Sequence, residues 1–589
     1  MVHIRLSIAS PDELAQQLRH GRAKGATPRG PCQGHAKGAR ARAQGDGGLD
    51  RVPGLSGSAP MARLSPMSWL HRLVVGLLCA ASPAAAADLG SVGDFDVRLD
   101  TTLRASLGLR LDRPNPSLLS DANADDGDRA FRRGAISARM DFMSQLDVSR
   151  GDLGFTLSVD GWYDIAYQTR DANHSTATFN PVSVSANGFP ADVRRLMGAT
   201  VELANAYVRD KFEIGGIPIT VRIGRQTLLW GESLFFPQDG IAAAQSPVDV
   251  IKQISQPLVE TREVLLPVGQ ADIHMSLPYG LSLEGYYQFE WRRDRTPGVA
   301  SYFSTSDVLD VGGQRAFTPR GDALFRGRDN TPSGLGQFGA ALRRTGEVVD
   351  LGLYAIRYDA KEPQIAAIYP SATTYRAVFP RGIELLGVSA STYLGDDTLS
   401  GEISGRWHMP LVSRGLASVP FGGLFGLLAL PAVSPPDPSV QAGYATGQTL
   451  HALVSYERQL RPGRLWDTAV LDAEFAVTDL LRVETHPETR LAGTTRLATA
   501  LEVVFTPRYY QVLPGLDLAV QLGVQLGLSG RSSVDPGMVA GTGNVTLSVS
   551  ANYRTVWDAG VSFTHFIGPS RDQALADRDF ITFTVSRTF

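Results

Sequence analysis

The chain ends in FITFTVSRTF (580–589), where apolar and polar side chains alternate. Counting back from Phe589, every second side chain is apolar except Arg587, and the four residues between them are Thr or Ser. In an extended strand successive side chains point to opposite faces, so this spacing places the apolar set on one face and the polar set on the other. The stretch therefore predicts a β-strand that separates an apolar from a polar environment.

The same alternation recurs along the chain in segments much longer than soluble proteins use. Strands in soluble domains usually have about five or six residues, whereas a tilted strand needs about 9–11 residues to cross a membrane. The longest segment is close to the start of the regular part of the chain. The alternating segments are FDVRLDTTLRASLGLRL (95–111), FTLSVDGWYDIAY (155–167), LSGEISGRWHM (399–409), VLDAEFAV (470–477), LDLAVQLGVQLGL (516–528) and VTLSVSANYR (545–554).

One face of these segments is too charged for a dry core, and the other is too apolar and extensive for water. Both faces make sense if the apolar side meets lipid and the polar side lines a wet or plugged interior. In hydrocarbon every backbone N–H and C=O must be paired internally, so the strands must close on themselves. We predict an all-β fold, a transmembrane antiparallel β-barrel of the bacterial outer membrane. An even number of about sixteen strands is expected, with fourteen to eighteen as the range.

Closure requires the last strand, FITFTVSRTF, to pair with the first, FDVRLDTTLRASLGLRL. An alternating final strand that ends in an aromatic residue, here Phe589, also resembles the sorting signal recognised by the outer-membrane assembly machinery. Arg587 departs from that pattern, so we expect it to snorkel to the interface or to turn inward. The alternative is an ordinary edge strand that happens to end the chain.

The N-terminal part predicts a leader rather than a domain. Basic residues, a short apolar run and a small-residue tract follow one another over 61–87, the order of a secretory signal peptide cleaved after Ala87. Residues 1–60 are rich in Arg, Gly and Ala, and we interpret them as a non-native extension from a start assigned too early; a functional basic tail is the alternative. The barrel then comprises 88–589, which places the protein in the cell outer membrane, in contact with its lipid. Both cysteines of the chain lie before the cleavage site.

Composition and spacing exclude several functions. The formal net charge is −3, and the part after the leader is more acidic, so nucleic-acid binding is not expected. The histidines of that part show no metal-ligand spacing, and we expect no cofactor and no metal. DANADDGD (121–128) resembles a calcium loop through Asp121, Asn123 and Asp125, but Gly127 comes one place late and no Glu closes the site. We interpret it as an acidic surface loop, with a dedicated ion site as the alternative.

The least strand-like region of the barrel is 221–268, which starts as a strand and then breaks into segments punctuated by Pro. Its charges cannot face lipid, where one charge at the midplane costs roughly 2–4 kcal/mol. We predict an inward-folded or plug-like insert that lines or narrows the lumen. A structural ion-pair network and contact with the solute remain equal alternatives for its polar side chains. The lining residues expected are Arg222, Arg225, Trp230, Glu232, Asp249, Glu260, Arg262 and Glu263.

Several motifs around this insert resemble one large family of bacterial outer-membrane proteins, catalogued as domain of unknown function 1302. The resemblance covers essentially the whole mature chain. It implies an envelope transport role, typically near an RND-type exporter and a periplasmic partner protein, with hydrophobic or lipid-like solutes; it supplies no functional residue. The motifs are DDGDRAFRRG (125–134), GWYDIAY (161–167), IGRQTLLWGESLFF, SPVDV, ETREVLLPV, LSLEGYYQFEW (281–291) and SYFSTSD (301–307).

The hypothesis that follows is a conduit, a channel or transporter that passes or exports small solutes and is not an enzyme. The rival is an outer-membrane enzyme of the lipase or deacylase type, which needs a nucleophile beside a base. No G-x-S-x-G elbow follows the leader, and His408 and His451 are the candidate bases. An adhesin or scaffold barrel would rest on the long loops alone. The Gly-rich stretch 419–433 predicts a loop packed on itself, or an apolar surface for a solute.

Overall fold

The computed structural model describes residues 87–256, 260–317, 323–368, 374–413 and 444–589. All of them belong to one compact unit, Leu64–Phe589. The predicted extension, nearly all of the predicted signal peptide and the stretch 419–433 lie outside the described residues. Among the residues described, no helix is both long and apolar enough to cross a membrane.

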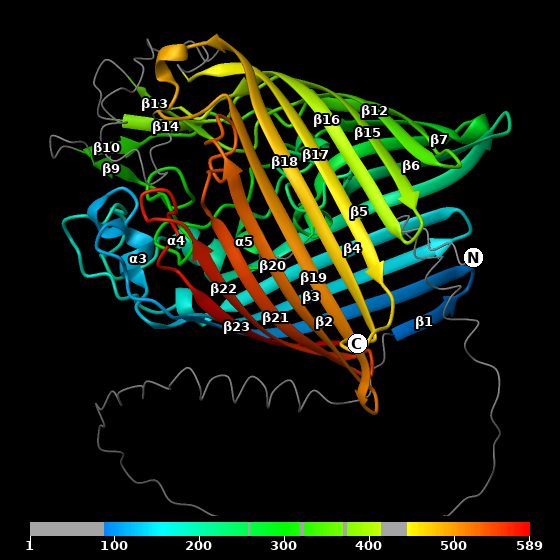
Figure 1. The fold of residues 1–589 in the computed structure, drawn as a ribbon, viewed down its shortest axis with the longest axis horizontal. Helices are drawn as coiled ribbons and strands as arrows, with labels where there is room; N and C mark the ends of the chain where they lie inside the picture. The colour runs from blue at the N-terminus through cyan, green and yellow to red at the C-terminus, as the bar shows by residue number, and fades with distance from the viewer. Residues whose placement is uncertain (1–86, 257–259, 318–322, 369–373, 414–443) are drawn as a thin grey trace, which may run out of the picture. The chain divides into compact units, whose positions relative to one another are not determined.

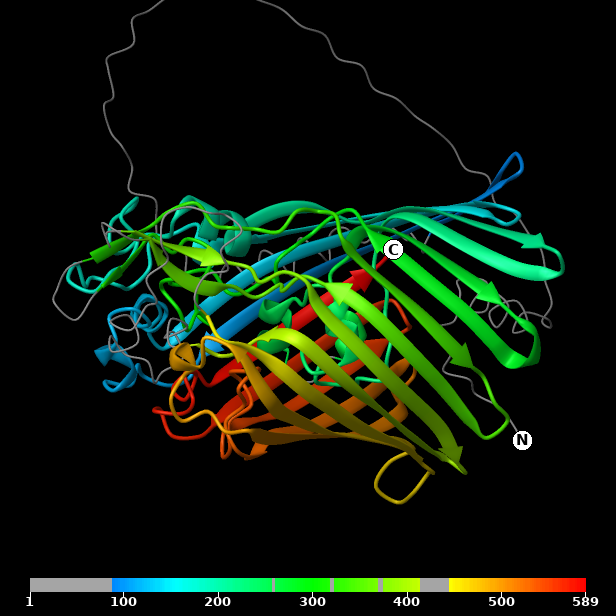
Figure 2. The same ribbon diagram turned by 90° about the horizontal axis from the view of Figure 1, so that it is seen from above.

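The described residues form a closed antiparallel barrel in which each strand pairs with the next along the chain (Figures 1 and 2). The barrel strands are β2 (Phe95–Arg110), β3 (Gly134–Arg150), β4 (Leu153–Asp164), β5 (Ala199–Ile214), β6 (Ile217–Gln226), β7 (Val268–Ser276), β8 (Leu281–Gln288), β11 (Gln337–Arg344), β12 (Val349–Tyr358), β15 (Ile383–Leu394), β16 (Asp397–Pro410), β17 (Thr446–Leu460), β18 (Thr468–Thr485), β19 (Leu497–Leu513), β20 (Leu516–Ser529), β21 (Gly543–Tyr553), β22 (Trp557–Ile567) and β23 (Phe580–Thr588). The predicted fold class is confirmed.

The barrel has 18 strands, at the upper end of the expected range rather than at about sixteen. The reason is that the connections at one end of the barrel are very short. Two residues suffice between β3 and β4, between β5 and β6, and between β15 and β16. The chain length per strand is therefore shorter than expected.

The first and last strands close the barrel, as predicted. β23 pairs with residues 102–110 of β2, with Leu107 opposite Phe583. Phe589 and Thr101 then exchange two backbone hydrogen bonds, of 3.2 and 2.8 Å. β1 (Ala87–Val92) pairs with the remaining end of β2 along the same edge. The end of the chain and β1 thus follow one another along β2 and leave neither half of its edge open.

The two faces of the wall differ as the alternation predicts. On β4 the outward Phe155 and Tyr163 are 38% and 45% exposed, whereas the inward Ser158 and Asp164 are buried. Apolar side chains of this kind recur at matching depth on neighbouring strands, for example Leu353 on β12 beside Val388 on β15. A continuous apolar exterior around a closed barrel is the surface that a bilayer requires.

Arg587 lies where the apolar alternation of β23 is interrupted near the end of the chain. Its side chain is buried, and the guanidinium carbon lies 5.1 Å from the ring centre of Trp557 and 4.4 Å from that of Phe589. Aromatic faces attract a guanidinium, so the charge is packed between two rings at the strand end. The charged group is thus buried against aromatic rings, whereas snorkelling would have carried it into water.

Long connections gather at the opposite end of the barrel from the short turns (Figure 1). Two of them, 289–336 and 359–382, contribute a small separate sheet in the order β13-β14-β10-β9. Its strands are β9 (Arg315–Phe317), β10 (Ala323–Arg326), β13 (Gln364–Ile368) and β14 (Thr374–Val378). The helical elements of the described residues are η1 (Leu118–Ser120), α3 (Asp126–Ala130), η2 (Ile165–Tyr167), α4 (Ala191–Val193), η3 (Arg194–Gly198), η4 (Ile241–Ala244), α5 (Val250–Ser255), α6 (Thr261–Val264), η5 (Pro278–Gly280) and η8 (Pro487–Thr489).

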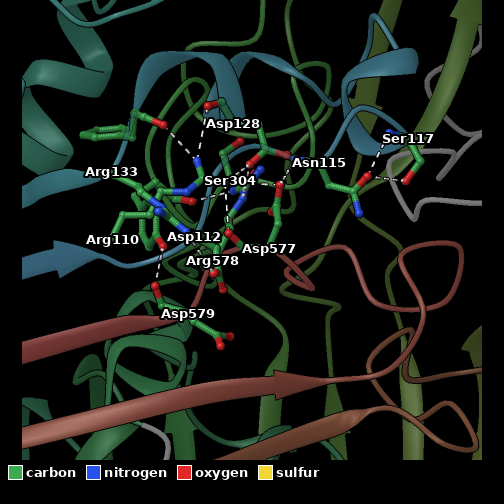
Figure 3. Close-up of polar contacts among 12 residues, drawn as sticks. Arg110, Asp112, Asn115, Ser117, Asp128, Arg133, Ser304, Asp577, Arg578 and Asp579 are labelled. Carbon is green, nitrogen blue, oxygen red and sulfur yellow. Dashed lines mark hydrogen bonds and ion pairs between the residues drawn. The ribbon is translucent and has the colours of Figure 1, made fainter.

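A buried ion network braces the closure seam at the long-loop end (Figure 3). Arg110, at the end of β2, pairs with Asp128 at 3.0 Å and with Asp577 at 3.2 Å. Arg578 pairs with the same Asp128 at 3.1 Å. Both guanidiniums and both carboxylates are buried, so no water solvates them. The opposite charges compensate one another instead. The network ties the first strand, the loop after it and the loop before the last strand.

Gly127 of α3 shows how closely these loops approach one another. A Cβ atom there would lie 2.6 Å from the carbonyl oxygen of Ser301 and 2.9 Å from that of Ser304. No side chain fits, because real Cβ atoms do not approach backbone oxygen so closely. The segment predicted as an acidic surface loop is instead folded in, with Asp125, Asp126 and Asp128 all buried. The surface interpretation is wrong because the loops 165–198 and 289–336 cover this segment.

The two faces of the wall can be distinguished with one matched pair of substitutions. Val388 and Met143 are 46% and 50% exposed, but Val388 faces outward, whereas Met143 pairs with inward Asp160. We expect Val388→Arg to lower the free energy of unfolding in lipid vesicles by about 2–4 kcal/mol, the cost of a charge at the lipid face. Met143→Arg should leave it within about 1 kcal/mol, as for most surface changes. Urea titration of refolded protein measures both; equal costs would contradict the assignment of faces.

Candidate functional site

The connection between β6 and β7 turns into the barrel instead of covering its mouth. Its helices η4, α5 and α6 lie within the ring of strands, where Figure 2 shows them in green between the two walls. Residues 230–241, here called the anchored segment, have little regular structure, so most of their backbone groups need partners from elsewhere. Inward side chains of β16, β17 and β18 supply those partners.

Glu474 on β18 binds three consecutive backbone N–H groups of the anchored segment. Leu234 donates to one carboxylate oxygen at 2.7 Å, and Phe235 and Phe236 donate to the other at 2.5 and 2.8 Å. The Ser455 hydroxyl on β17 donates to the same carboxylate at 2.8 Å. Four hydrogen bonds hold this buried carboxyl group in place between the wall and the segment. Glu474 therefore acts as an anchor.

Glu402 on β16 binds the two ends of the same segment. Its carboxylate accepts the backbone N–H of Glu232 at 2.5 Å and that of Ile241 at 2.6 Å. Glu232 in turn accepts a hydrogen bond from Ser389 on β15, and burial raises the pKa of its carboxyl against the opposing effect of Arg343. A turn of the insert is thus closed by a side chain of the wall.

Arg406 lies four residues after Glu402 on the same face of β16 and binds backbone carbonyl groups of that turn. Its guanidinium donates to the carbonyl oxygens of Gln238, Asp239 and Gly240 at 3.1, 2.7 and 3.0 Å. Glu402 accepts and Arg406 donates, so together they satisfy both kinds of backbone group.

Asp239 fixes the tip of the anchored segment to two further strands. His451 Nδ1 on β17 lies 3.1 Å from Asp239 Oδ1, and the Thr478 hydroxyl on β18 donates to the same oxygen at 2.9 Å. Burial raises the pKa of Asp239, which Arg406 and the Thr478 hydrogen bond oppose. Thr449 lies 3.0 Å from the other ring nitrogen of His451.

This Asp–His–Thr order resembles that of a nucleophile activated by a base. Each of the three side chains is buried, however: His451 is 1% exposed and Thr449 0%. A substrate bond would have to come within about 3 Å of the hydroxyl, whereas the Thr449 side chain is fully buried. His408, the other candidate base, lies on a bulge of β16 and offers its backbone N–H to Glu484.

Aromatic side chains of the anchored segment pack against the wall, in part where the wall residues are glycine or alanine. The Trp230 indole donates to Glu284 of β8 at 2.7 Å and meets the Tyr286 ring edge-on, 5.1 Å between centres. A Cβ atom at Gly339 on β11 would lie 3.1 Å from the Trp230 ring, so glycine makes room for it. Phe235 and Phe236 pack in a cluster that includes Ala476, Ala498 and Ala500.

The predicted lining residues of the insert divide into buried and water-facing groups. Trp230 and Glu232 belong to the anchored segment. Asp249 caps α5 by accepting the Lys252 N–H at 3.0 Å and pairs with Arg295 at 2.8 Å. Three others face water: Glu260 pairs with Arg262, and Glu263 pairs with Lys252, at 2.8 and 3.2 Å. The exposed side-chain fraction is 61% for Arg262 and 51% for Glu263.

The two predicted arginines of β6 go to opposite faces, because they are three positions apart along a strand. Arg222 pairs with Asp272 of β7 at 3.0 Å. Arg225, at the long-loop end, pairs with Glu290 at 3.6 Å and donates to the carbonyl of Pro267 at 3.4 Å. Neither arginine contacts the anchored segment through a described hydrogen bond or ion pair.

Three of the anchors on the wall, Glu402, Arg406 and Glu474, were not among the predicted site residues, and His451 was singled out only as a candidate catalytic base. Their signal was present in the sequence, because Glu402, Arg406 and Glu474 fall on the polar face of the alternating segments 399–409 and 470–477. Alternation reveals the face of a strand but not the distant residue that it meets. Only the three-dimensional register links β16–β18 to the insert.

One protein family and several solved structures are similar to this chain. The family model described as "Protein of unknown function (DUF1302)" matches residues 69–589. Among solved structures, OccK8 (OprE) of Pseudomonas aeruginosa is 11% identical with a TM-score of 0.38, covering 84% of this chain and 98% of its own. The outer membrane channel DcaP of Acinetobacter baumannii is 9% identical with a TM-score of 0.35, covering 85% and 100%. These likenesses are too distant to carry a functional argument, and no curated protein matches.

The role of Glu474 can be tested with Glu474→Ala, which removes the acceptor for three backbone donors. Each buried donor left unpaired costs about 1–3 kcal/mol, so the free energy of local opening should fall by about 3 kcal/mol or more. Hydrogen exchange of peptides covering 232–241, and tryptic cleavage at Arg262, measure it. Glu474→Gln should recover part of the loss, because one oxygen still accepts. The water-facing Glu263→Ala is the control; equal exchange in both would exclude the anchoring role.

Proposed function

We propose a transport function for this chain, which belongs to the family described as "Protein of unknown function (DUF1302)": an outer-membrane conduit whose inward-folded insert narrows the passage. One observation carries the proposal, a closed barrel of 18 strands with a folded segment fixed to its inner wall. Barrels of 16–18 strands enclose an aqueous channel rather than a packed core. A structure built only to anchor or adhere would need neither the lumen nor the insert.

One side of the insert is bound to the barrel wall, and the other side presents polar groups to the lumen. This arrangement suits a constriction. Its anchored segment is bound by β16, β17 and β18, whereas Arg262 and Glu263 face water. The wall across the lumen also presents charge, for example the exposed Arg104 on the inward face of β2. Solutes pass between these charged surfaces, and the insert sets the width.

The class of solute and the partners follow from the family resemblance. Small hydrophobic or lipid-like molecules are the cargo, delivered by an RND-type exporter through a periplasmic partner protein. A charged constriction favours solutes with a polar group beside an apolar body, because a charge gains little from a purely apolar surface. The outer-membrane assembly machinery inserts the barrel by its last strand, which ends at Phe589.

Solute flux across liposomes that contain the purified barrel tests the conduit. We expect flux above that of protein-free liposomes, and more flux when residues 228–266 are replaced by a short Gly-Ser turn, because the constriction is gone. Arg262→Glu keeps every anchor and should shift the preference toward cations, as charged rings do in channels. Flux absent from both the intact and the shortened barrel would refute a conduit. Circular dichroism checks folding of the shortened form.

An enzyme built on the barrel wall predicts different behaviour for the two candidate bases. We expect ester hydrolysis by the folded barrel to stay at background, with no change in His408→Ala or His451→Ala. Tryptic cleavage of the insert should rise only in His451→Ala, because Asp239 loses its partner. A catalytic His451 would instead show turnover in the wild type that the substitution abolishes.

A further inference from the structure

Three buried carboxylates meet at the long-loop end, outside the insert. Asp125 and Asp126 belong to the loop after β2, and Asp307 belongs to the loop after β8. One oxygen of each lies within 4.8 Å of the other two, and all three residues are 0% exposed. Like charges this close repel strongly unless something compensates them. The segment 171–180, from the loop after β4, covers the cluster.

Some buried oxygens of the cluster and its surroundings accept no hydrogen bond from the described residues. Asp126 is satisfied by the Asn173 side-chain amide and the Asn180 backbone N–H, both at 2.9 Å. Asp307 accepts the Asp126 backbone N–H at 3.0 Å through Oδ2. Its Oδ1 is buried and has no donor among the described residues, nor has the amide oxygen of Asn180. Buried oxygens of this kind are rare unless they bind a water or an ion.

The neighbouring charges do not balance the cluster. Arg129 pairs with Asp125, and Asp121 and Asp171 add further negative charge nearby. Arg578 lies close to Asp307. Its guanidinium, however, is already committed to Asp128 and to the carbonyl oxygens of Tyr302 and Ser304. An excess of buried negative charge remains that no side chain neutralises.

Burial leaves two ways to compensate these carboxylates, a proton or a metal cation. It raises the pKa of Asp125 to about 6 and the pKa values of Asp126 and Asp307 well above the usual range. A proton compensates one carboxyl group. A cation placed among the three carboxylates would be coordinated by an oxygen of each at once, and the buried Oδ1 of Asp307 has no donor among the described residues that would compete with it.

We infer that Asp125, Asp126 and Asp307 form a divalent-cation site of the calcium class that ties together the loops at the barrel mouth. All of its ligand atoms are oxygens, which calcium prefers and zinc or copper does not. Calcium–oxygen distances of about 2.3–2.6 Å allow ligands on opposite sides of the ion to lie about 5 Å apart. One oxygen of each carboxylate lies within 4.8 Å of the other two, inside that limit. Asp125 alone is shared with the pattern Asp121, Asn123 and Asp125 of the sequence.

The site would join three loops that are far apart in the chain. Asp126 already holds Asn173 and Asn180 of the loop 165–198, and Asp307 comes from the loop 289–336. An ion at their meeting point adds bonds that each loop lacks by itself. Binding to the folded state alone raises stability by mass action. The mouth should therefore be more ordered with the ion than without it.

The test is terbium luminescence and thermal unfolding of the full-length barrel in detergent. Terbium replaces calcium at oxygen sites, and calcium should displace it, with an affinity of about 10⁻⁴–10⁻³ M or tighter, as for extracellular modules. Calcium should raise the melting temperature relative to EDTA-treated protein. Asp307→Asn should weaken binding at least about tenfold, as loss of one charge-assisted bond implies. Asp112→Asn, an exposed residue of the same loop, is the control and should bind as the wild type does.

The sign of the Asp307→Asn effect distinguishes a binding site from a structural carboxylate. Without calcium the variant should melt at or above the wild-type temperature, because one repelling charge is gone. With calcium it should lose the gain that the wild type shows. Absence of terbium binding and of any calcium effect on wild-type melting would overturn the proposal, even if the variant failed to fold. A melting temperature that rises on acidification but ignores calcium would assign protons, and not a cation, to the cluster.

Discussion

Everything in this fold depends on the rule that a backbone polar group in hydrocarbon must be paired. A strand that faces lipid has no water to bind, so its N–H and C=O groups must reach another strand on both sides. That requirement joins β23 to β2 across almost the whole sequence and brings Phe589 onto Thr101. Once the sheet is closed, its inner face is free of lipid. Charged side chains on that inner face carry little of the free-energy cost that they would have in lipid, and they can bind other parts of the chain.

Backbone polar groups must also be paired inside the barrel, where side chains of the wall serve as their partners. The anchored segment has neither a helix nor a sheet to satisfy its backbone, and it is shielded from solvent. Glu474, Glu402 and Arg406 take the place of the missing ladder by accepting N–H groups and donating to carbonyls. Each of these charges serves several backbone groups, which compensates for the desolvation of a buried ion. An irregular segment can therefore be held as rigidly as a regular element.

The sequence predicted what a period of two can reveal: the strands, their faces, the closing pair and the break at 221–268. It placed Glu402, Arg406 and Glu474 on the polar face but not against the insert, because alternation contains no information on register between distant segments. It treated 121–128 as exposed, since an acidic run is normally solvated. Six barrel strands, β3 to β8, lie between Asp126 and Asp307 in the sequence, so their meeting depends on how the loops cover one another. Such contacts follow from the closed barrel and not from local pattern.

Two neighbouring clusters at the long-loop end thus use buried charge differently. At the seam, Arg110 and Arg578 pair with Asp128, and Arg110 also pairs with Asp577, so each carboxylate has a guanidinium beside it. Nearby, Asp126 and Asp307 carry charge that no side chain matches. A cation that binds only the folded state stabilises that state by mass action, so the acidic cluster can respond to ions in the solution. The insert is instead fixed to the wall by hydrogen bonds from Glu402, Arg406 and Glu474, so the width of the constriction is set by the chain itself. The order of the loops above it is open to control by the surrounding solution, so access to the mouth can change while the constriction remains fixed.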